Sequence, residues 1–127
     1  MSSVVLDSSA LLACLNQEAG SEAVVDLVAG ALLSTVNLAE TISVLIRQGA
    51  SKDKALEILQ LWDFNVVDFE RSLAEETGAL IEKTRSTGLS LGDRACLALA
   101  RIRSLPVVTA DRSWSGVEVG VRIQVIR

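Results

Sequence analysis

Val4-Val-Leu-Asp-Ser-Ser-Ala-Leu-Leu12 is the stretch of sequence that decides the fold. A short, β-branched apolar run stops at Asp7, and an apolar segment of helical character follows Ser8 and Ser9. Apolar runs this short, with no polar alternation, are typical of strands buried on both faces. A buried strand that leads straight into a helix is the first unit of an α/β protein.

The same alternation continues along the chain, where Gly, Ser and Pro mark the ends of successive apolar segments. The pattern predicts helices over 10–15, 21–28, 35–48, 51–62 and 90–104, and one that ends near Arg85. It predicts strands over 4–6, 31–34, 64–67, 106–109 and 121–126. We therefore expect an α/β fold with a mostly parallel sheet of about five strands, in one domain over residues 1–127.

Composition narrows the class of protein. The chain has 127 residues, is 50% hydrophobic and carries 12 Lys and Arg against 16 Asp and Glu, a net charge of −4. This apolar fraction excludes a disordered chain, and no apolar run approaches the roughly 20 residues that cross a bilayer. The first seven residues carry no basic leader, so we expect a mature, cytoplasmic protein.

Missing residue types limit the chemistry. The chain has no His, and its two cysteines, Cys14 and Cys96, lie far apart among apolar residues, where a free thiol usually packs as a small hydrophobe. No glycine-rich phosphate-binding motif occurs. Catalysis would have to rely on carboxylates, hydroxyls, arginines and a metal ion that they hold.

Four acids fall at or near the predicted carboxyl ends of strands, where ligands bind in open α/β sheets: Asp7, Glu40, Asp93 and Asp111. Three have a structural alternative. Asn37-x-x-Glu40 and Ser90-x-x-Asp93 match a helix capping box, and Asp111 could cap a turn. Asp7 lacks this alternative, because it closes a strand that is expected to be buried.

Several carboxylates facing a core are costly unless a cation holds them together. Asp93 heads an apolar helix stripe, and Glu40 shares a stripe with Val36 and Val44. Carboxylate ligands without His or Cys favour Mg²⁺ or Mn²⁺. Such a cation is suited to activating water and neutralising charge on a phosphodiester.

Four motifs in register resemble the PIN-domain ribonucleases, and most of all the small VapC-type toxins of toxin–antitoxin pairs. They are the stretch around Asp7, Asn37-Leu-Ala-Glu40, Leu89-Ser-Leu-Gly-Asp93 with the helix after it, and Val-Val-Thr109-Ala-Asp111-Arg112. The resemblance spans nearly the whole chain and implies an α/β/α sandwich. It also implies metal-dependent endonucleolytic cleavage of RNA that leaves 5′-phosphate and 3′-hydroxyl ends.

The resemblance also implies roles for individual residues. Asp7 and Asp93 would be the principal ligands of Mg²⁺ or Mn²⁺. Glu40 would bind the metal or position water. Asp111 would bind a second metal or support the ligands without binding the metal itself. Three hydroxyls would orient the acids: Ser8, Ser9 and Thr109. A cognate antitoxin and a homodimer are implied in the same way.

The sequence offers fewer indications of the residues that would contact a substrate or a partner. Arg94 and Arg112 each follow a proposed ligand and are candidates to bind RNA phosphate, with ordinary surface charge as the alternative. Trp114 is expected to pack under a loop rather than stack on a base. Helix 51–62, which ends at Trp62, could bind an antitoxin or a second subunit, although core packing is the simpler interpretation.

Three other functions stay open. They are a PIN nuclease that processes RNA without being a toxin, a catalytically silent PIN module that binds RNA or protein, and a phosphotransfer domain with an Asp after its first strand. The last needs a second acid beside Asp7 and a late Lys, and the chain has neither.

Overall fold

The computed structural model describes residues 3–127 and contains one five-stranded sheet whose strands are all parallel, in the order β3-β2-β1-β4-β5. The strands are β1 (Val5–Leu6), β2 (Leu32–Ser34), β3 (Asn65–Val67), β4 (Val107–Thr109) and β5 (Ile123–Val125). The predicted α/β class is confirmed. Of the predicted domain 1–127, Met1 and Ser2 lie outside the described residues.

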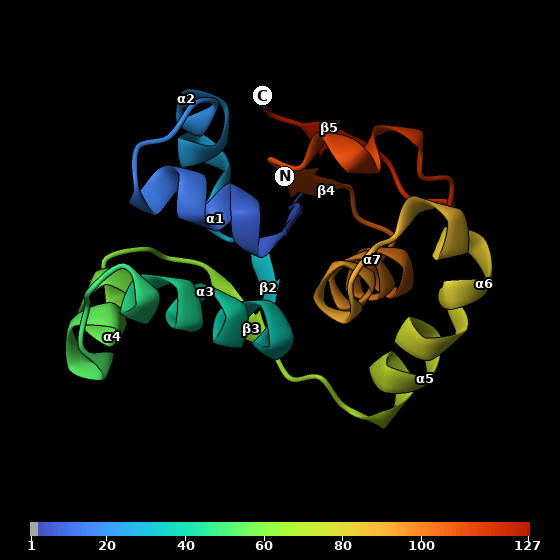
Figure 1. Ribbon diagram of the computed structural model, residues 1–127, viewed down its shortest axis with the longest axis horizontal. Helices are drawn as coiled ribbons and strands as arrows, with labels where there is room; N and C mark the ends of the chain where they lie inside the picture. The colour runs from blue at the N-terminus through green and yellow to red at the C-terminus, as the bar shows by residue number, and fades with distance from the viewer. Residues whose placement is uncertain (1–2) are drawn as a thin grey trace.

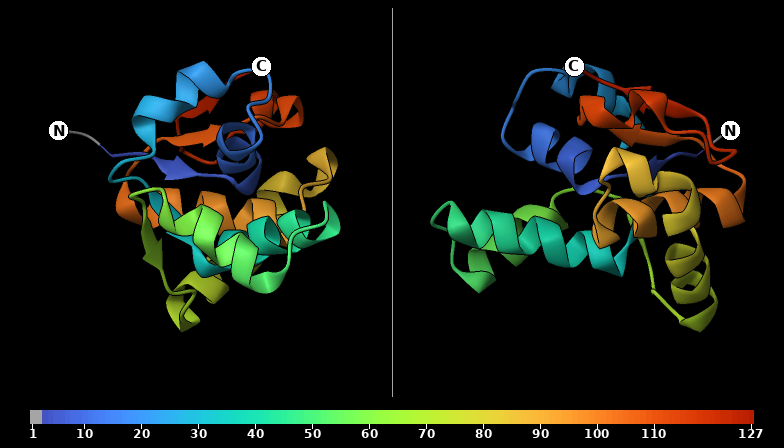
Figure 2. Two further views of the ribbon diagram at one scale, coloured as in Figure 1. Left: turned by 90° about the vertical axis from the view of Figure 1, so that its left-hand side faces the viewer. Right: turned by 45° about the vertical axis from the view of Figure 1, so that its right-hand side comes forward.

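Helices cover both faces of this sheet (Figures 1 and 2). The α-helices are α1 (Ser8–Leu15), α2 (Ser21–Val24), α3 (Thr35–Arg47), α4 (Lys52–Gln60), α5 (Arg71–Ala79), α6 (Ile81–Thr84) and α7 (Leu91–Arg103). Three short 3₁₀ helices complete the set: η1 (Val25–Leu27), η2 (Arg85–Thr87) and η3 (Arg112–Gly116). In the part of the chain that the structure describes, no helix combines the length and apolar character needed to cross a bilayer.

Alternating strand residues divide the core into two clusters, because successive side chains of a strand point to opposite faces. Val5 and Val107 pack with α5 and α7, whereas Leu6, Leu33 and Val108 pack with α1 to α4. Both residues of β1 are fully buried, as predicted for a central parallel strand. Packing on both faces of the sheet therefore fixes the position of β1, and with it the position of Asp7, the residue that follows.

Several expected boundaries are corrected. The helix expected over 21–28 is α2 followed by the 3₁₀ helix η1, and the helix expected over 51–62 is α4, which ends at Gln60. The helix expected to run unbroken to about Arg85 is divided into α5, α6 and η2, with a break at Leu80, which is buried in the core. The last strand is β5, Ile123–Val125, shorter at both ends than the expected 121–126. Both thiols are free and buried, in agreement with the prediction for Cys14 and Cys96.

Candidate active site

Asp7 lies at the carboxyl end of the central strand and is also the N-cap residue of α1. Its side chain makes no capping hydrogen bond and is only 3% exposed. Its backbone N–H donates to the Val108 carbonyl at 3.0 Å, which places its carboxylate beside the end of β4. The sheet thus brings Asp7 next to residues about a hundred positions away.

Two hydroxyls donate to one oxygen of this carboxylate. Ser9 Oγ lies 2.6 Å and Thr109 Oγ1 2.9 Å from Asp7 Oδ2. The same hydroxyls accept the backbone N–H groups of Ala110 and Asp111. The other oxygen, Asp7 Oδ1, is buried and has no hydrogen-bond partner among the described residues.

The environment of Asp7 opposes its ionisation. Burial raises the pKa of the Asp7 carboxyl from 3.8 to about 6. The hydrogen bonds from Ser9 and Thr109 act in the opposite direction, and the negative charges of Asp93 and Glu40 add to the increase in pKa. Asp7 is therefore a half-satisfied buried acid that lies within electrostatic range of two other acids.

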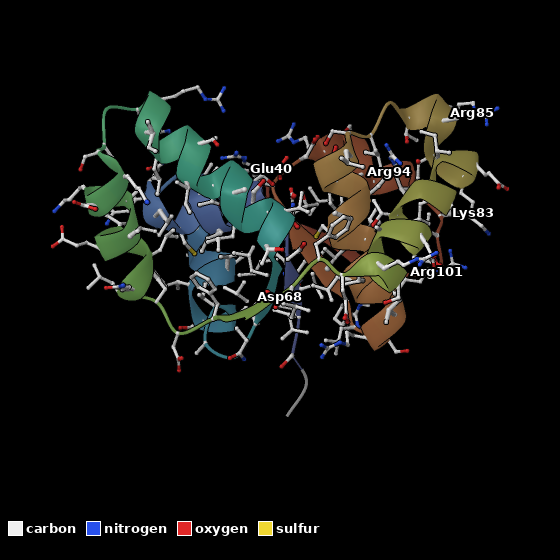
Figure 3. The ribbon with its side chains drawn as sticks, turned by 90° about the horizontal axis from the view of Figure 1, so that it is seen from below. Glu40, Asp68, Lys83, Arg85, Arg94 and Arg101 are labelled. Carbon is white, nitrogen blue, oxygen red and sulfur yellow. The ribbon has the colours of Figure 1, made fainter. Side chains whose placement is uncertain are left out.

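Glu40 lies in the second turn of α3 and is half-buried. Its Oε1 accepts hydrogen bonds from Ser8 Oγ at 3.2 Å and from Asn37 Nδ2 at 2.9 Å. Seen from below, Glu40 lies on the part of α3 that adjoins α7 (Figure 3). It therefore connects α1, through Ser8, with α3.

Asn37-x-x-Glu40 is not a capping box, so that structural alternative is wrong. The α3 helix starts at Thr35 directly after β2, and its N-cap is Ser34, whose Oγ accepts the Val36 N–H at 3.2 Å. Asn37 is consequently the third residue of the helix and is completely buried. In the described residues, the Glu40 carboxylate accepts its hydrogen bonds from side chains and not from the backbone N–H groups at the start of the helix.

Asp93 does make the expected capping box with Ser90 at the start of α7. The Ser90 N–H donates to Asp93 Oδ2 at 3.0 Å, and the Asp93 N–H donates to Ser90 Oγ at 3.1 Å. Partial burial raises the pKa of Asp93, the hydrogen bonds to Ser90 oppose this, and the charges of Asp111 and Glu40 contribute to it. The capping role of Asp93 does not explain why its carboxylate lies within electrostatic range of two other acids, Asp111 and Glu40.

Asp111 is exposed and caps η3, as the structural alternative predicted, because its Oδ1 accepts the Ser113 N–H at 2.9 Å. Its charge nevertheless reaches Asp93. Across residues 3–127, the ion pairs of the structure use other acids, and none of the four is neutralised by Lys or Arg.

The candidate phosphate-binding arginines occupy different settings. Arg94 points from α7 toward α5, where its Nη1 donates to the Thr77 carbonyl at 3.0 Å, and its buried Nε has no partner among the described residues. Arg112 is exposed, and its Nε donates to the carbonyl of Arg127 at 2.9 Å. Figure 3 shows Arg94 on the side of α7 that faces α5 and α6, whereas Lys83 and Arg85 lie farther out on α6 and η2.

The expectations for Trp114 and for the helix that leads to Trp62 can also be compared with the structure. Trp114 is fully buried, so packing under a loop is confirmed. In α4, Ala55 and Leu59 are buried and Trp62, just beyond the helix, packs partly against the core, as the simpler interpretation required. Leu61 is 82% exposed and was not singled out from the sequence.

The site fits a hard divalent cation in its donor chemistry, although it holds no preformed cage. Within residues 3–127, no group of three His, Cys, Asp or Glu side chains lies close enough to hold a metal ion by itself. Mg²⁺ commonly binds through one or two carboxylates and keeps several waters, so a preformed cage is not required. Two observations favour such an ion. Within residues 3–127, Asp7 Oδ1 has no hydrogen-bond partner, and no Lys or Arg forms an ion pair with any of the four acids.

The fold and the site together define a parallel α/β protein with a cluster of acids at the carboxyl ends of its central strands. The family model of the PIN domain matches residues 4–119. The chain belongs to the PIN-domain family, a family of nucleases, and the resemblance seen in the sequence is confirmed.

Solved structures agree with this fold. The DNA-bound VapBC of Salmonella typhimurium is 20% identical, covers 100% of both chains and has a TM-score of 0.76. VapC20 of Mycobacterium tuberculosis, described as a toxin that cleaves the sarcin–ricin loop, is 19% identical over 94% of this chain and 99% of its own, with a TM-score of 0.73. VapBC-5 from the same organism is 24% identical over 100% and 99%, with a TM-score of 0.67. A comparison with curated protein sequences found no match.

Sequence reasoning overlooked Asn37 and Gly92 as parts of the site. Asn37 Nδ2 donates not only to Glu40 but also to the Gly92 carbonyl at 3.1 Å. One signal was available, because Asn37, Thr41 and Leu45 form one buried stripe and a polar residue in such a stripe needs a partner. A glycine in the first turn of a helix was a second signal, because it permits close approach.

Proposed function

We propose that this protein is a metal-dependent endoribonuclease and the toxin component of a toxin–antitoxin pair. The observation that carries the nuclease proposal is Asp7: a buried carboxylate with one oxygen fully used and the other without a partner, within range of two further acids. Neither a silent binding module nor a structural core has a use for so costly a group.

Each acid has a part in the proposal. Asp7 and Asp93 would be the principal ligands of Mg²⁺ or Mn²⁺, and Glu40 and Asp111 would complete the site. A bound cation would neutralise charge on the phosphodiester and lower the pKa of a water coordinated to it. Ser9 and Thr109 hold the Asp7 carboxylate in one orientation, and Ser8 does the same for Glu40.

RNA as substrate is supported by the family and by the basic side chains beside the acids. Arg94 lies one residue from Asp93, and Arg112 follows Asp111 at the start of η3. Arg112 is exposed and would contact a phosphate beside the bond to be cleaved, since phosphate contacts from Arg fix the position of a nucleic acid. The Arg94 guanidinium donates to the Thr77 carbonyl and would have to turn away from α5 to make such a contact. The net charge of −4 would oppose binding in the absence of the cation.

A toxin role is supported by the solved structures of similar fold, several of which are VapBC toxin–antitoxin complexes. By analogy we propose a cognate antitoxin, a homodimer and a cytoplasmic location. The exposed Leu61, which follows α4, would be one contact of such a partner.

A nuclease assay tests the catalytic proposal. Purified wild type should cleave single-stranded RNA with Mn²⁺ and should stop when EDTA is added. Asp7→Asn should reduce the rate at least a hundredfold, on the order expected when a principal catalytic group is lost. Asp63→Asn, which changes an exposed acid that precedes β3 at the opposite end of the strands, is the matched control. Equal cleavage by wild type and Asp7→Asn would overturn the proposal.

A growth assay tests the toxin proposal. Expression of the chain alone should slow bacterial growth, and Asp93→Asn should relieve this effect. If wild type cleaves RNA in vitro but expression leaves growth unchanged, the RNA-processing alternative is favoured over the toxin.

A further inference from the structure

Asn37 connects Glu40 to the backbone next to Asp93 without touching solvent. It is 0% exposed, and its one amide nitrogen donates both to Glu40 Oε1 at 2.9 Å and to the backbone carbonyl of Gly92 at 3.1 Å. Gly92 is in the first turn of α7, next to Asp93. A single neutral group therefore joins the acid of α3 to the turn of α7 that carries the next acid.

Gly92 shows how closely α3 and α7 approach at this point. A Cβ atom on residue 92 would overlap the carboxylate of Glu40, including both of its oxygens. The backbone of α7 thus lies directly against the Glu40 side chain, and the residue is buried. Any side chain at position 92 would push Glu40 away from α7 or separate the two helices.

Something must hold these acids together when no cation is present, because their charges repel. The charge of Glu40 contributes to the raised pKa of Asp93. A Lys or Arg in place of Asn37 would hold Glu40 but would cancel the charge that attracts a cation. An amide donor fixes the carboxylate and leaves its charge in place.

Packing alone does not account for an amide at this position. Asn37 Oδ1 is buried without a hydrogen-bond partner in the described residues, which carries a cost that an apolar side chain would avoid. Thr41, one turn further along the same buried stripe, is a contrast, because its hydroxyl donates to the Asn37 carbonyl of its own helix at 2.8 Å rather than to a carboxylate.

We infer that Asn37 is a positioning residue that fixes the Glu40 carboxylate relative to Asp93 by clamping α3 onto the first turn of α7 at Gly92. The inference rests on the nuclease function proposed above. Among the described residues, Glu40 Oε1 is occupied by Asn37 and Ser8, and Oε2 accepts no hydrogen bond. Asn37 thereby determines which oxygen of Glu40 is available to the cation or to substrate.

The test compares Asn37→Ala with Thr41→Val, a matched loss of one buried polar group from the same face of α3. RNA cleavage is measured at saturating Mn²⁺, and Mn²⁺ binding to the full-length protein is measured separately by calorimetry. Asn37→Ala should lower kcat about 10- to 100-fold, as for other residues that orient ligands, and weaken Mn²⁺ binding several-fold, while KM for RNA stays within about threefold. Thr41→Val should keep kcat and Mn²⁺ affinity within about twofold of wild type.

Two further variants keep the test decisive if Asn37→Ala does not fold. Asn37→Ser is a milder change to the packing, because it keeps a polar side chain. It still breaks the connection, because a serine hydroxyl is too short to reach both Glu40 and the Gly92 carbonyl. Gly92→Ala leaves Asn37 in place but displaces Glu40, and should reproduce the kcat loss. Circular dichroism and thermal unfolding identify the variants that are folded.

The outcomes separate this inference from the proposed function. If wild type cleaves RNA and the folded Asn37 variants behave like Thr41→Val in kcat and in Mn²⁺ binding, the positioning role is wrong and the nuclease function stands. If wild type neither binds Mn²⁺ nor cleaves RNA, both proposals fall.

Discussion

Thr109 Oγ1 donates a hydrogen bond of 2.9 Å to Asp7 Oδ2 across 102 positions of sequence. The contact joins the residue after β1 to the last residue of β4, two strands that are parallel neighbours in the sheet. Because Thr109 Oγ1 also accepts the Asp111 N–H at 3.1 Å, one hydroxyl orders the backbone at a second acid as well.

Replacing Thr109 therefore should affect both stability and activity. Thr109→Val keeps the shape of the side chain but removes the donor to Asp7 and the acceptor for the Asp111 N–H. We expect a loss of about 1–3 kcal/mol in the free energy of unfolding and roughly a 10- to 100-fold loss in the rate of RNA cleavage. Chemical denaturation and the nuclease assay measure the two effects. Thr109→Ser, which keeps the hydroxyl, should retain most of the activity; an equal loss in both variants would contradict a role for the hydrogen bond.

The raised pKa of Asp7 predicts a pH-dependent cost to stability. The pKa of Asp7 in the folded protein is about 6, against an ordinary value of 3.8 for an Asp carboxyl, so the folded protein binds this proton more tightly than the unfolded chain does. The contribution of Asp7 to stability is thus fully present below about pH 4 and is lost as the pH rises through about 6. Without metal, Asp7→Asn should be more stable than wild type at pH 7 by about 1–3 kcal/mol.

Denaturation of metal-free protein at pH 4 and pH 7 checks the sign of this effect. The advantage of Asp7→Asn should shrink toward zero at pH 4. A variant that is less stable than wild type at pH 7 would mean that the Asp7 carboxylate is stabilised in the fold rather than strained.

Asp93 has two separable roles, as a capping residue and as a proposed ligand. Asp93→Asn retains an oxygen that can accept the Ser90 N–H, so stability should change little while RNA cleavage falls at least a hundredfold. Ser90→Ala removes the N-cap and should cost about 1 kcal/mol, or roughly 3–5 °C in Tm, with a much smaller effect on cleavage. The reverse pattern would reduce Asp93 to a helix cap.

Arg112 should contribute to RNA affinity rather than to folding, because its side chain is exposed and its Nε donates to the carbonyl of Arg127, also an exposed residue. Arg112→Ala should weaken RNA binding and reduce the slope of log K against log salt by about 1. Binding measured at several salt concentrations with a cleavage-deficient background provides the slope. Arg103→Ala, which removes an exposed Arg at the far end of α7, should leave the slope unchanged.

The sequence predicted the fold well because its elements are short and sharply bounded. Val4-Val-Leu-Asp7 and Pro106-Val-Val-Thr109 are apolar runs that a polar residue ends, and parallel strands place such endings at one edge of the sheet. The positions of Asp7 and Thr109 near each other follow from this topology. The break at Leu80 did not follow, because neither Leu80 nor either of its neighbours in the sequence is a Gly or Pro that would mark it.

The contacts among the proposed site residues were harder to predict than the positions of these residues near the ends of the strands. The motif Asn37-x-x-Glu40 has the spacing of a capping box, but the N-cap of α3 is Ser34, three residues before Asn37. Asn37 therefore lies inside the first turn, where its side chain is buried. The closeness of Gly92 to Glu40 depends on how α3 packs on α7, which no local pattern encodes. Charge alone could not show that Arg94 is directed toward the Thr77 carbonyl.

Calorimetric titration of the metal-free protein with Mn²⁺ tests most directly whether these acids form a cation site. Wild type should bind Mn²⁺, and Asp7→Asn should abolish that binding while Asp63→Asn retains it. Binding of equal strength in wild type and Asp7→Asn, or no binding by wild type, would contradict the account.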